Sequence, residues 1–147
     1  MTSSGPRLVE INAGRCNGLD FKLLTDVCYG LNQFDATVSA LLLPAADGFN
    51  LLPSRPPPEL RCHGRLVTLV SHVAGTLVGL RHAEELDAME SLISFEPEAA
   101  EPGDAVQHTV DLDTCAGTAM LAHCDEAVLS AEYQALRTLQ PTMFEVL

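Results

Sequence analysis

Apolar and polar positions change their spacing along the chain, and each spacing predicts a different element. Residues 8–11 predict a short strand, in which Val9 and Ile11 project on one side and Glu10, like the following Asn12, on the other. The stretch "LDFKLLTDVCYGLNQFDATVSALLLP" then carries apolar residues at helical spacing, which predicts two helices. Gly30 is expected to end the first helix, Asn32 to cap the second and Pro44 to close it.

The second half of the chain predicts strands and helices in alternation. "HGRLVTLVSHVAGTLVGL" contains two β-rich apolar runs, which predict a β-hairpin with a tight turn at Ala74 and Gly75. "HAEELDAMESL" predicts a short acidic helix, and the "EPGD" and "CAG" breaks predict short strands around them. "DEAVLSAEYQALRTLQ" predicts an amphipathic helix with Asp125 as its N-cap and Pro141 beyond its end. These elements give an α+β fold.

A proline-rich stretch, "PAADGFNLLPSRPPPEL", separates the two helices from the second half. Proline fixes φ and removes a backbone donor, so this stretch is expected to be an extended linker. The sequence is therefore divided into residues 1–43, a linker at 44–61 and residues 62–147.

Composition restricts the classes of function. Hydrophobic residues make up 47% of the 147 positions, enough for a packed core. The net charge is −12 with 8 Lys and Arg, which argues against nucleic acid as a partner because phosphates need a basic surface. No apolar run is long enough for a bilayer and no signal pattern opens the chain, so no membrane association and a soluble, cytoplasmic protein are expected. The five cysteines form no C-x-x-C pair and are expected to be reduced thiols, with Cys28 a small core residue.

The first strand also carries the most specific candidate chemistry. Glu10 and Asn12 are two residues apart, so their side-chain oxygens project on the same side of an extended chain. Oxygen ligands of this kind suit Mg²⁺, which usually keeps waters or substrate phosphates as its other ligands. Arg15 can meet a phosphate or carboxylate with its fork of donors. The alternative is that the Glu/Asn alternation is only the solvated face of a half-buried strand.

A second acidic cluster follows in the second half. Residues 101–104 ("EPGD") are followed by His108, Asp111 and Asp113, which together imitate a metal or acid–base site. Turns are acidic for structural reasons, and the order of a calcium loop is absent. The structural interpretation is therefore favoured for this cluster.

"RLVEINAGRCNGLDFKLLTDVCYGLNQFDATVSALL" resembles the C-terminal end of the ATP-grasp fold, in which an E-x-N-x-R signature precedes a helix and an x-G-x-N-x-x-D stretch opens a second helix. Residues 62–147 look like the small C-terminal subdomain of ATP-grasp carboxylate–amine ligases of the L-amino-acid ligase and carnosine synthase type. The resemblance implies the end of an ATP-grasp domain at 1–43, comprising a strand plus two helices, and a ligase C-terminal subdomain at 62–147.

The resemblance also implies a role for each residue of the first motif. It makes Glu10 and Asn12 ligands of the Mg²⁺ that bridges the phosphates of ATP, and it brings Arg15 to the transferred phosphoryl group or the substrate. The implied reaction activates a carboxylate with ATP to an acyl phosphate, which an amine then attacks. One departure concerns Arg15, because Ala13 and Gly14 separate it from Asn12 where the signature has one residue.

In this family the other nucleotide-binding elements lie upstream of the E-x-N motif, whereas nine residues precede Glu10 here. The chain alone is therefore expected to be inactive, and ligation of small carboxylate and amine substrates to require the missing lobes in the same or a partner polypeptide. The alternative from another class is a non-catalytic interaction module, derived from a truncated ligase, whose opening strand pairs with another sheet edge or an intact ligase.

Overall fold

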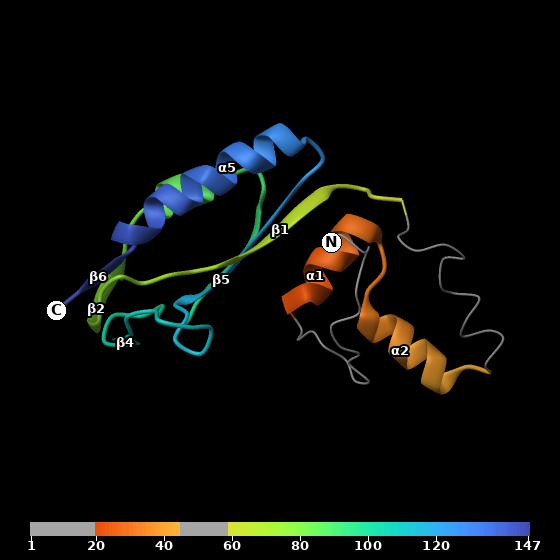
Figure 1. The fold of residues 1–147 in the computed structure, drawn as a ribbon, viewed down its shortest axis with the longest axis horizontal. Helices are drawn as coiled ribbons and strands as arrows, with labels where there is room; N and C mark the ends of the chain where they lie inside the picture. Colours follow the sequence, from red (N-terminus) through yellow and green to blue (C-terminus); the bar gives the residue numbers. More distant parts are fainter. Residues whose placement is uncertain (1–19, 45–58) are drawn as a thin grey trace, which may run out of the picture.

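The structure, a computed structural model, describes residues 20–44 and 59–147 (Figure 1). The predicted strand at 8–11 and most of the predicted linker lie outside these ranges. Across the described ranges, helices and short strands are mixed, which confirms the α+β class.

Two consecutive helices open the described chain, as predicted. Helix α1 spans Asp20–Tyr29 and α2 spans Gln33–Leu42. Gly30 separates them with φ of +72°, a left-handed conformation in which glycine has no Cβ to clash. The Asn32 side chain accepts hydrogen bonds from the first backbone N–H groups of α2, so the predicted cap is confirmed.

Three strands form the first antiparallel sheet. They are β1 (His63–Thr68), β3 (Leu92–Pro97) and β5 (Gly117–His123), in the order β1-β5-β3. Strand β5 lies at the centre, and four of its seven residues form a continuous buried run, 119–122. A strand covered on both faces has this continuous apolar character instead of alternation.

A second antiparallel sheet has the order β4-β2-β6, with β2 (Gly75–Leu80) between β4 (Ala105–Val106) and β6 (Phe144–Val146). Strand β6 was not predicted, because three residues are too few to show a period of two. Its pairing with β2 brings the C-terminal end of the chain back beside the middle of the sequence.

The predicted β-hairpin is wrong. Strand β1 pairs with β5 over its whole length, whereas β2 pairs with β4 and β6. The reason is visible at Leu69, which is fully buried and exchanges backbone hydrogen bonds with Gly117 and Ala116 at 2.8 and 2.9 Å. The chain therefore follows β5 beyond the end of β1 and enters the second sheet instead of turning back.

The remaining helices agree with the sequence in kind. Helix α4 spans Ala83–Asp87 and is the predicted short acidic helix. Helix α5 spans Glu126–Leu139, and Asp125 accepts a hydrogen bond from Ala127 N–H at its start, as predicted. A short 3₁₀ helix, η1 (Gln140–Thr142), follows α5 directly.

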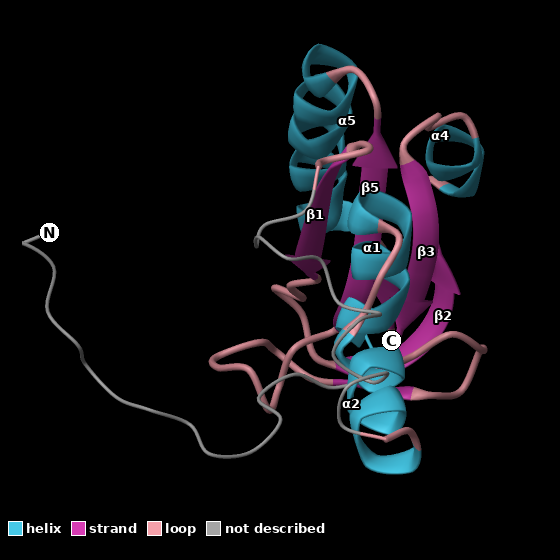
Figure 2. Cartoon of the chain, turned by 90° about the vertical axis from the view of Figure 1, so that its right-hand side faces the viewer, coloured by secondary structure: helices cyan, strands magenta, loops and turns pink. Residues whose placement is uncertain are grey.

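Helices α1 and α5 lie on opposite faces of the first sheet (Figures 1 and 2). Neighbouring residues of β1 show this, because Gly64 faces Cys28 of α1 while Arg65 lies over Tyr133 of α5. The main core fills the space on the α5 side and continues into the second sheet. It includes the fully buried Leu69, Leu77, Leu121, Leu129, Leu136 and Met143.

Candidate functional site

The three predicted site residues, Glu10, Asn12 and Arg15, lie outside the described residues. The described chain begins five positions after Arg15, at Asp20 of α1. The described part contains a helical corner that follows the motif, several cavities and several polar clusters.

The corner between α1 and α2 is built from the G-x-N-x-x-D stretch. Gly30 N–H donates to Asp26 O at 2.8 Å and ends α1. Asn32, 1% exposed, accepts from the N–H groups of Phe34 and Asp35, both at 2.9 Å. Its amide nitrogen donates to the carboxylates of Asp26 and Asp35 at 2.6 and 2.7 Å. One buried side chain therefore fixes the angle at which α2 leaves α1.

An ion pair between Lys22 and Asp26 lies beside this corner. The ammonium of Lys22 lies 2.6 Å from Asp26 Oδ2. This hydrogen bond, followed by the one from Asn32, holds the pKa of Asp26 below its ordinary value. Asp26 is thus kept ionised and accepts hydrogen bonds from both Lys22 and Asn32. The role of this carboxylate in α1 is therefore structural.

A cleft of about 300 Å³ lies between α1, β1 and α5. Its polar lining includes the Cys28, His63, Arg65 and Glu126 side chains. The charge of Arg65 is already engaged, because its guanidinium lies 4.6 Å from the centre of the Tyr133 ring and donates to Ser130 Oγ at 3.1 Å. The cleft can accept a small, partly apolar group.

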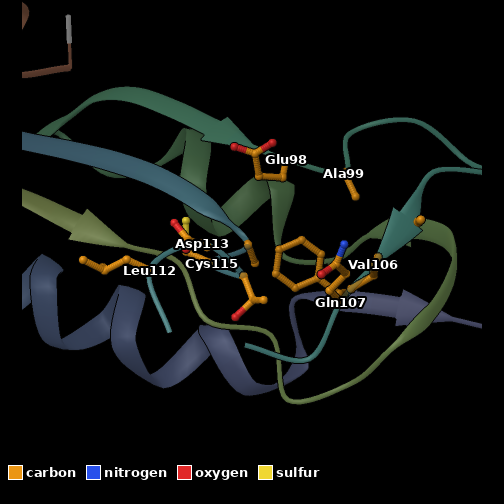
Figure 3. A pocket seen from close by; sticks show the side chains of 11 residues that line it. Glu98, Ala99, Val106, Gln107, Leu112, Asp113 and Cys115 are labelled. Atoms are coloured by element: carbon orange, nitrogen blue, oxygen red, sulfur yellow. The ribbon is translucent and has the colours of Figure 1, made fainter. Parts of the chain in front are cut away.

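A second cavity, of about 310 Å³, is formed by the segments around β4 and before β5 (Figure 3). Asp113 and Cys115 line one side, Val106 and Gln107 the opposite side, and Glu98 lies above them. Among the described residues, its lining contains two carboxylates and no Lys, Arg or His. This chemistry suits an amine or another cation and is unsuited to the phosphates of a nucleotide.

His82 links two elements through its ring. Its Nε2 lies 2.8 Å from Thr142 Oγ1, and its Nδ1 lies 3.4 Å from Glu85 Oε1. The backbone of His82 is left-handed, with φ of +69°, a conformation that non-glycine residues adopt at a cost. Hydroxyl, imidazole and carboxylate are in the order of a catalytic relay. Neither of the two cavities above is lined by these residues, so this set is better understood as a tie between α4 and η1.

Another polar set joins α5 to the turn before β3. Glu132 accepts from the N–H groups of Glu90 and Ser91 at 3.0 and 2.8 Å. Burial raises the pKa of Glu132, but the Ser91 side chain, these two N–H donors and the nearby His123 outweigh it, and the pKa lies below its ordinary value.

The acidic stretch 101–113 contributes carboxylates to turns. Asp104 Oδ2 accepts from the N–H groups of Ala100 and Glu101 at 3.0 and 2.9 Å. These donors hold the pKa of Asp104 below its ordinary value. Asp111 Oδ1 accepts from Thr114 N–H at 3.0 Å. In the described part of the chain, no group of three or more His, Cys, Asp and Glu side chains is arranged to hold a metal ion.

One juxtaposition could not be seen in the sequence. Cys28 is buried in α1, as predicted, but its Sγ lies 3.7 Å from Cys62 Sγ, just before β1. The two residues are separated by 34 positions, and no spacing motif announces such a contact.

Known proteins give no further guide to the site. No protein family model, curated protein or solved structure matches this chain. Among the described helices, none is both long and apolar enough to cross a bilayer.

Proposed function

We propose that this chain is the C-terminal portion of an ATP-grasp carboxylate–amine ligase of the L-amino-acid ligase and carnosine synthase type. The observation that carries the proposal is a succession of two patterns in the right order. The E-x-N motif with Arg15 comes first, and the G-x-N-x-x-D stretch of Gly30, Asn32 and Asp35 follows. The second pattern gains support from the corner described above, where all three residues have a defined structural role.

In this proposal Glu10 and Asn12 supply oxygen ligands, and Arg15 supplies a cationic fork. Mg²⁺, when bound, would neutralise charge on the phosphates of ATP. Arg15 would hold the transferred phosphoryl oxygens or the substrate carboxylate by paired hydrogen bonds. The reaction converts the carboxylate and ATP to an acyl phosphate and ADP, and attack by the amine releases phosphate and forms an amide-type bond.

The remaining phosphate ligands must come from lobes that precede this motif in the family. An isolated carboxylate and amide bind Mg²⁺-ATP weakly, since most of the binding energy is missing. We therefore propose that the chain by itself is inactive, and that activity requires those lobes in the same or another polypeptide. Ligase activity in the cytoplasm is the corresponding expectation for location.

The decisive experiment uses a longer polypeptide, in which the sequence encoded upstream of Met1 is retained. The upstream sequence should contain lysine-bearing strands and a glycine-rich flap, and the product should consume ATP only when both a carboxylate and an amine are present. Glu10→Gln should lower this rate about a hundredfold or more, whereas Glu59→Gln, at an exposed carboxylate, should leave it unchanged.

Calorimetry on the chain alone gives a second test. No Mg²⁺-dependent binding of ATP is expected. Clear binding that disappears in Glu10→Ala would contradict the proposed inactivity, although it would support the proposed ligands. An upstream sequence without ATP-grasp elements, together with no nucleotide binding, would overturn the ligase proposal.

A second candidate is a non-catalytic interaction module, which one feature of α2 favours. No residue of α2 is fully buried, and Val38, Leu41 and Leu42 are 52%, 78% and 78% exposed. Neighbouring apolar side chains at a helix end lower the free energy when another surface covers them. If this candidate is correct, Leu41→Glu with Leu42→Glu should abolish association of the chain with an intact ligase, measured by light scattering. Under the ligase proposal the isolated chain forms no such complex.

A further inference from the structure

Two thiols that are distant in sequence meet between the helical corner and the first sheet. Cys28 lies near the end of α1, and Cys62 directly precedes β1. Their sulfurs are 3.7 Å apart, and Cys62 Sγ is also 3.6 Å from the carbonyl oxygen of Val27. Both cysteines are free thiols in the structure.

The backbone holds the two residues beside each other. Arg61 N–H donates to the carbonyl oxygen of Cys28 at 2.8 Å, one residue before Cys62. On the other side, Gly64 lies so close to α1 that a Cβ there would be 2.5 Å from Cys28 Sγ. A disulfide requires a sulfur separation of about 2.0 Å, so the sulfurs need only a small approach between segments that are already fastened.

We propose that Cys28 and Cys62 form a reversible disulfide that fastens α1 to the start of β1, with a small-molecule disulfide as the oxidant. The proposal is independent of the ligase function, because it depends only on described residues. It also differs from a structural disulfide framework, since the pair is an accessible thiol next to a buried one.

The difference in exposure sets the order of the two exchange steps. Cys62 is half-buried and reachable, whereas Cys28 is 4% exposed. Burial, followed by the neighbouring Cys62 thiol, raises the pKa of Cys28 to about 11, so its thiolate is scarce at neutral pH. The Cys62 side chain therefore reacts first with the external disulfide.

The exchange balances in two steps. The Cys62 thiolate attacks one sulfur of the external disulfide, which forms a mixed disulfide and releases one small thiol. Cys28 then loses its proton to solvent, and its thiolate attacks Cys62 Sγ, which forms the protein disulfide and releases the second small thiol. Two protein thiols are oxidised, and one external disulfide is reduced to two thiols.

The bridge would close a chain loop that contains α2 and the connection to β1. Closing a loop of this length restricts the unfolded chain more than the folded one, in which the segments already touch. The oxidised protein should therefore unfold at a higher temperature than the reduced protein, by about 5 °C. Reduction by dithiothreitol should remove this difference.

The test treats the whole chain with oxidised glutathione and maps the cysteines by mass spectrometry without reduction. The expected product links the peptide of Cys28 to that of Cys62. Cys28→Ser should stop at a stable glutathione adduct on Cys62, because no second thiol can displace it. Cys62→Ser should leave Cys28 unmodified, and Cys124→Ser, at an exposed thiol, should still give the linked peptide.

The wild-type chain alone can overturn the proposal, so the test does not depend on how the variants fold. A persistent glutathione adduct in the wild type, a linkage of Cys62 to any other cysteine, or modification of Cys28 before Cys62 would each refute it. Equal unfolding temperatures of the oxidised and reduced forms would refute the claim that the bridge fastens α1.

Discussion

The amide nitrogen of Asn32 donates a 2.6 Å hydrogen bond to Asp26 Oδ1, and this bond joins the last turns of α1 to the first turn of α2. The same side chain caps α2, so one residue performs two functions in the corner. A buried amide is stable there only because its donors and acceptors all have partners.

Replacing Asn32 separates these two functions. Asn32→Ser keeps an oxygen that can cap α2 but loses the donor to Asp26, whereas Asn32→Ala loses both. We expect Asn32→Ala to lower the free energy of unfolding by about 2 kcal/mol and Asn32→Ser by about half as much. Urea unfolding followed by circular dichroism measures both. As a control, Leu41→Ala, at an exposed position of α2, should change the free energy of unfolding little. Equal losses of unfolding free energy in Asn32→Ala and Asn32→Ser would contradict a stabilising role for the capping oxygen.

The close contact between α1 and the first sheet depends on Gly64, because glycine has no side chain that would separate them. A Cβ at this position would lie 2.5 Å from Cys28 Sγ and 2.7 Å from Leu24 Cδ1. Gly64→Ala is therefore expected to push α1 outward and to lower the free energy of unfolding by about 1–3 kcal/mol. Gly79→Ala provides the control, because apart from its chain neighbours no described residue has an atom within 4 Å of a Cβ there. Amide exchange in α1 should increase only in the first variant, and unchanged exchange would show that α1 does not rest on Gly64.

Two features of Gly117 oppose a side chain, namely a positive φ and a closely packed neighbour, whereas Gly103 has only the positive φ. Its φ is +121°, and a Cβ would lie 2.6 Å from Pro97 Cα of the paired strand β3. Gly103 has a similar φ of +104°, but beyond its chain neighbours no described residue comes within 4 Å of a Cβ there. Gly103→Ala should cost about 1–2 kcal/mol from backbone strain alone, and Gly117→Ala distinctly more. Thermal unfolding of both variants measures the difference, and similar melting temperatures would mean that β3 yields to the added methyl group.

The capping residues show why part of this fold can be predicted from sequence. Asn32 and Asp125 bond to N–H groups two or three residues away, so a local pattern contains the needed information. The hairpin prediction failed because the partner of β1 is β5, about 50 positions later, and two adjacent apolar runs give no sign of that choice.

The same limit applies to the candidate sites. The spacing of Glu10 and Asn12 is a local pattern and gives a prediction that the described residues leave open. The approach of Cys28 to Cys62 depends on how α1 packs on β1, which is a tertiary relationship. His82, at the N-cap of α4, and Thr142 of η1 meet in the same way. Contacts between side chains that tertiary packing brings together from distant segments can be found only in the structure.

Glu132 predicts how the stability of the protein depends on pH. Its folded-state pKa lies below the ordinary value of 4.5, because burial, which raises the pKa, is outweighed by the Ser91 side chain, the N–H donors of Ser91 and Glu90, and His123. A lowered pKa stabilises the folded state above pH 4.5, and this contribution is lost as the pH falls through the folded-state pKa. The free energy of unfolding should therefore decrease as the pH falls from 4.5 through the folded-state pKa of Glu132.

Glu132→Gln tests this dependence. The amide retains one oxygen for one N–H group but turns its own donor toward the other, so about 1–3 kcal/mol of unfolding free energy should be lost at pH 7. The difference from the wild type should shrink as the pH falls from 4.5 through the folded-state pKa of Glu132, because protonation then removes the charge of the wild-type carboxylate. Urea unfolding at several pH values measures it, with Glu59→Gln as the control at an exposed carboxylate. If the difference in unfolding free energy is constant from pH 7 to pH 3, the shape of the Glu132 side chain, and not its charge, stabilises the turn before β3.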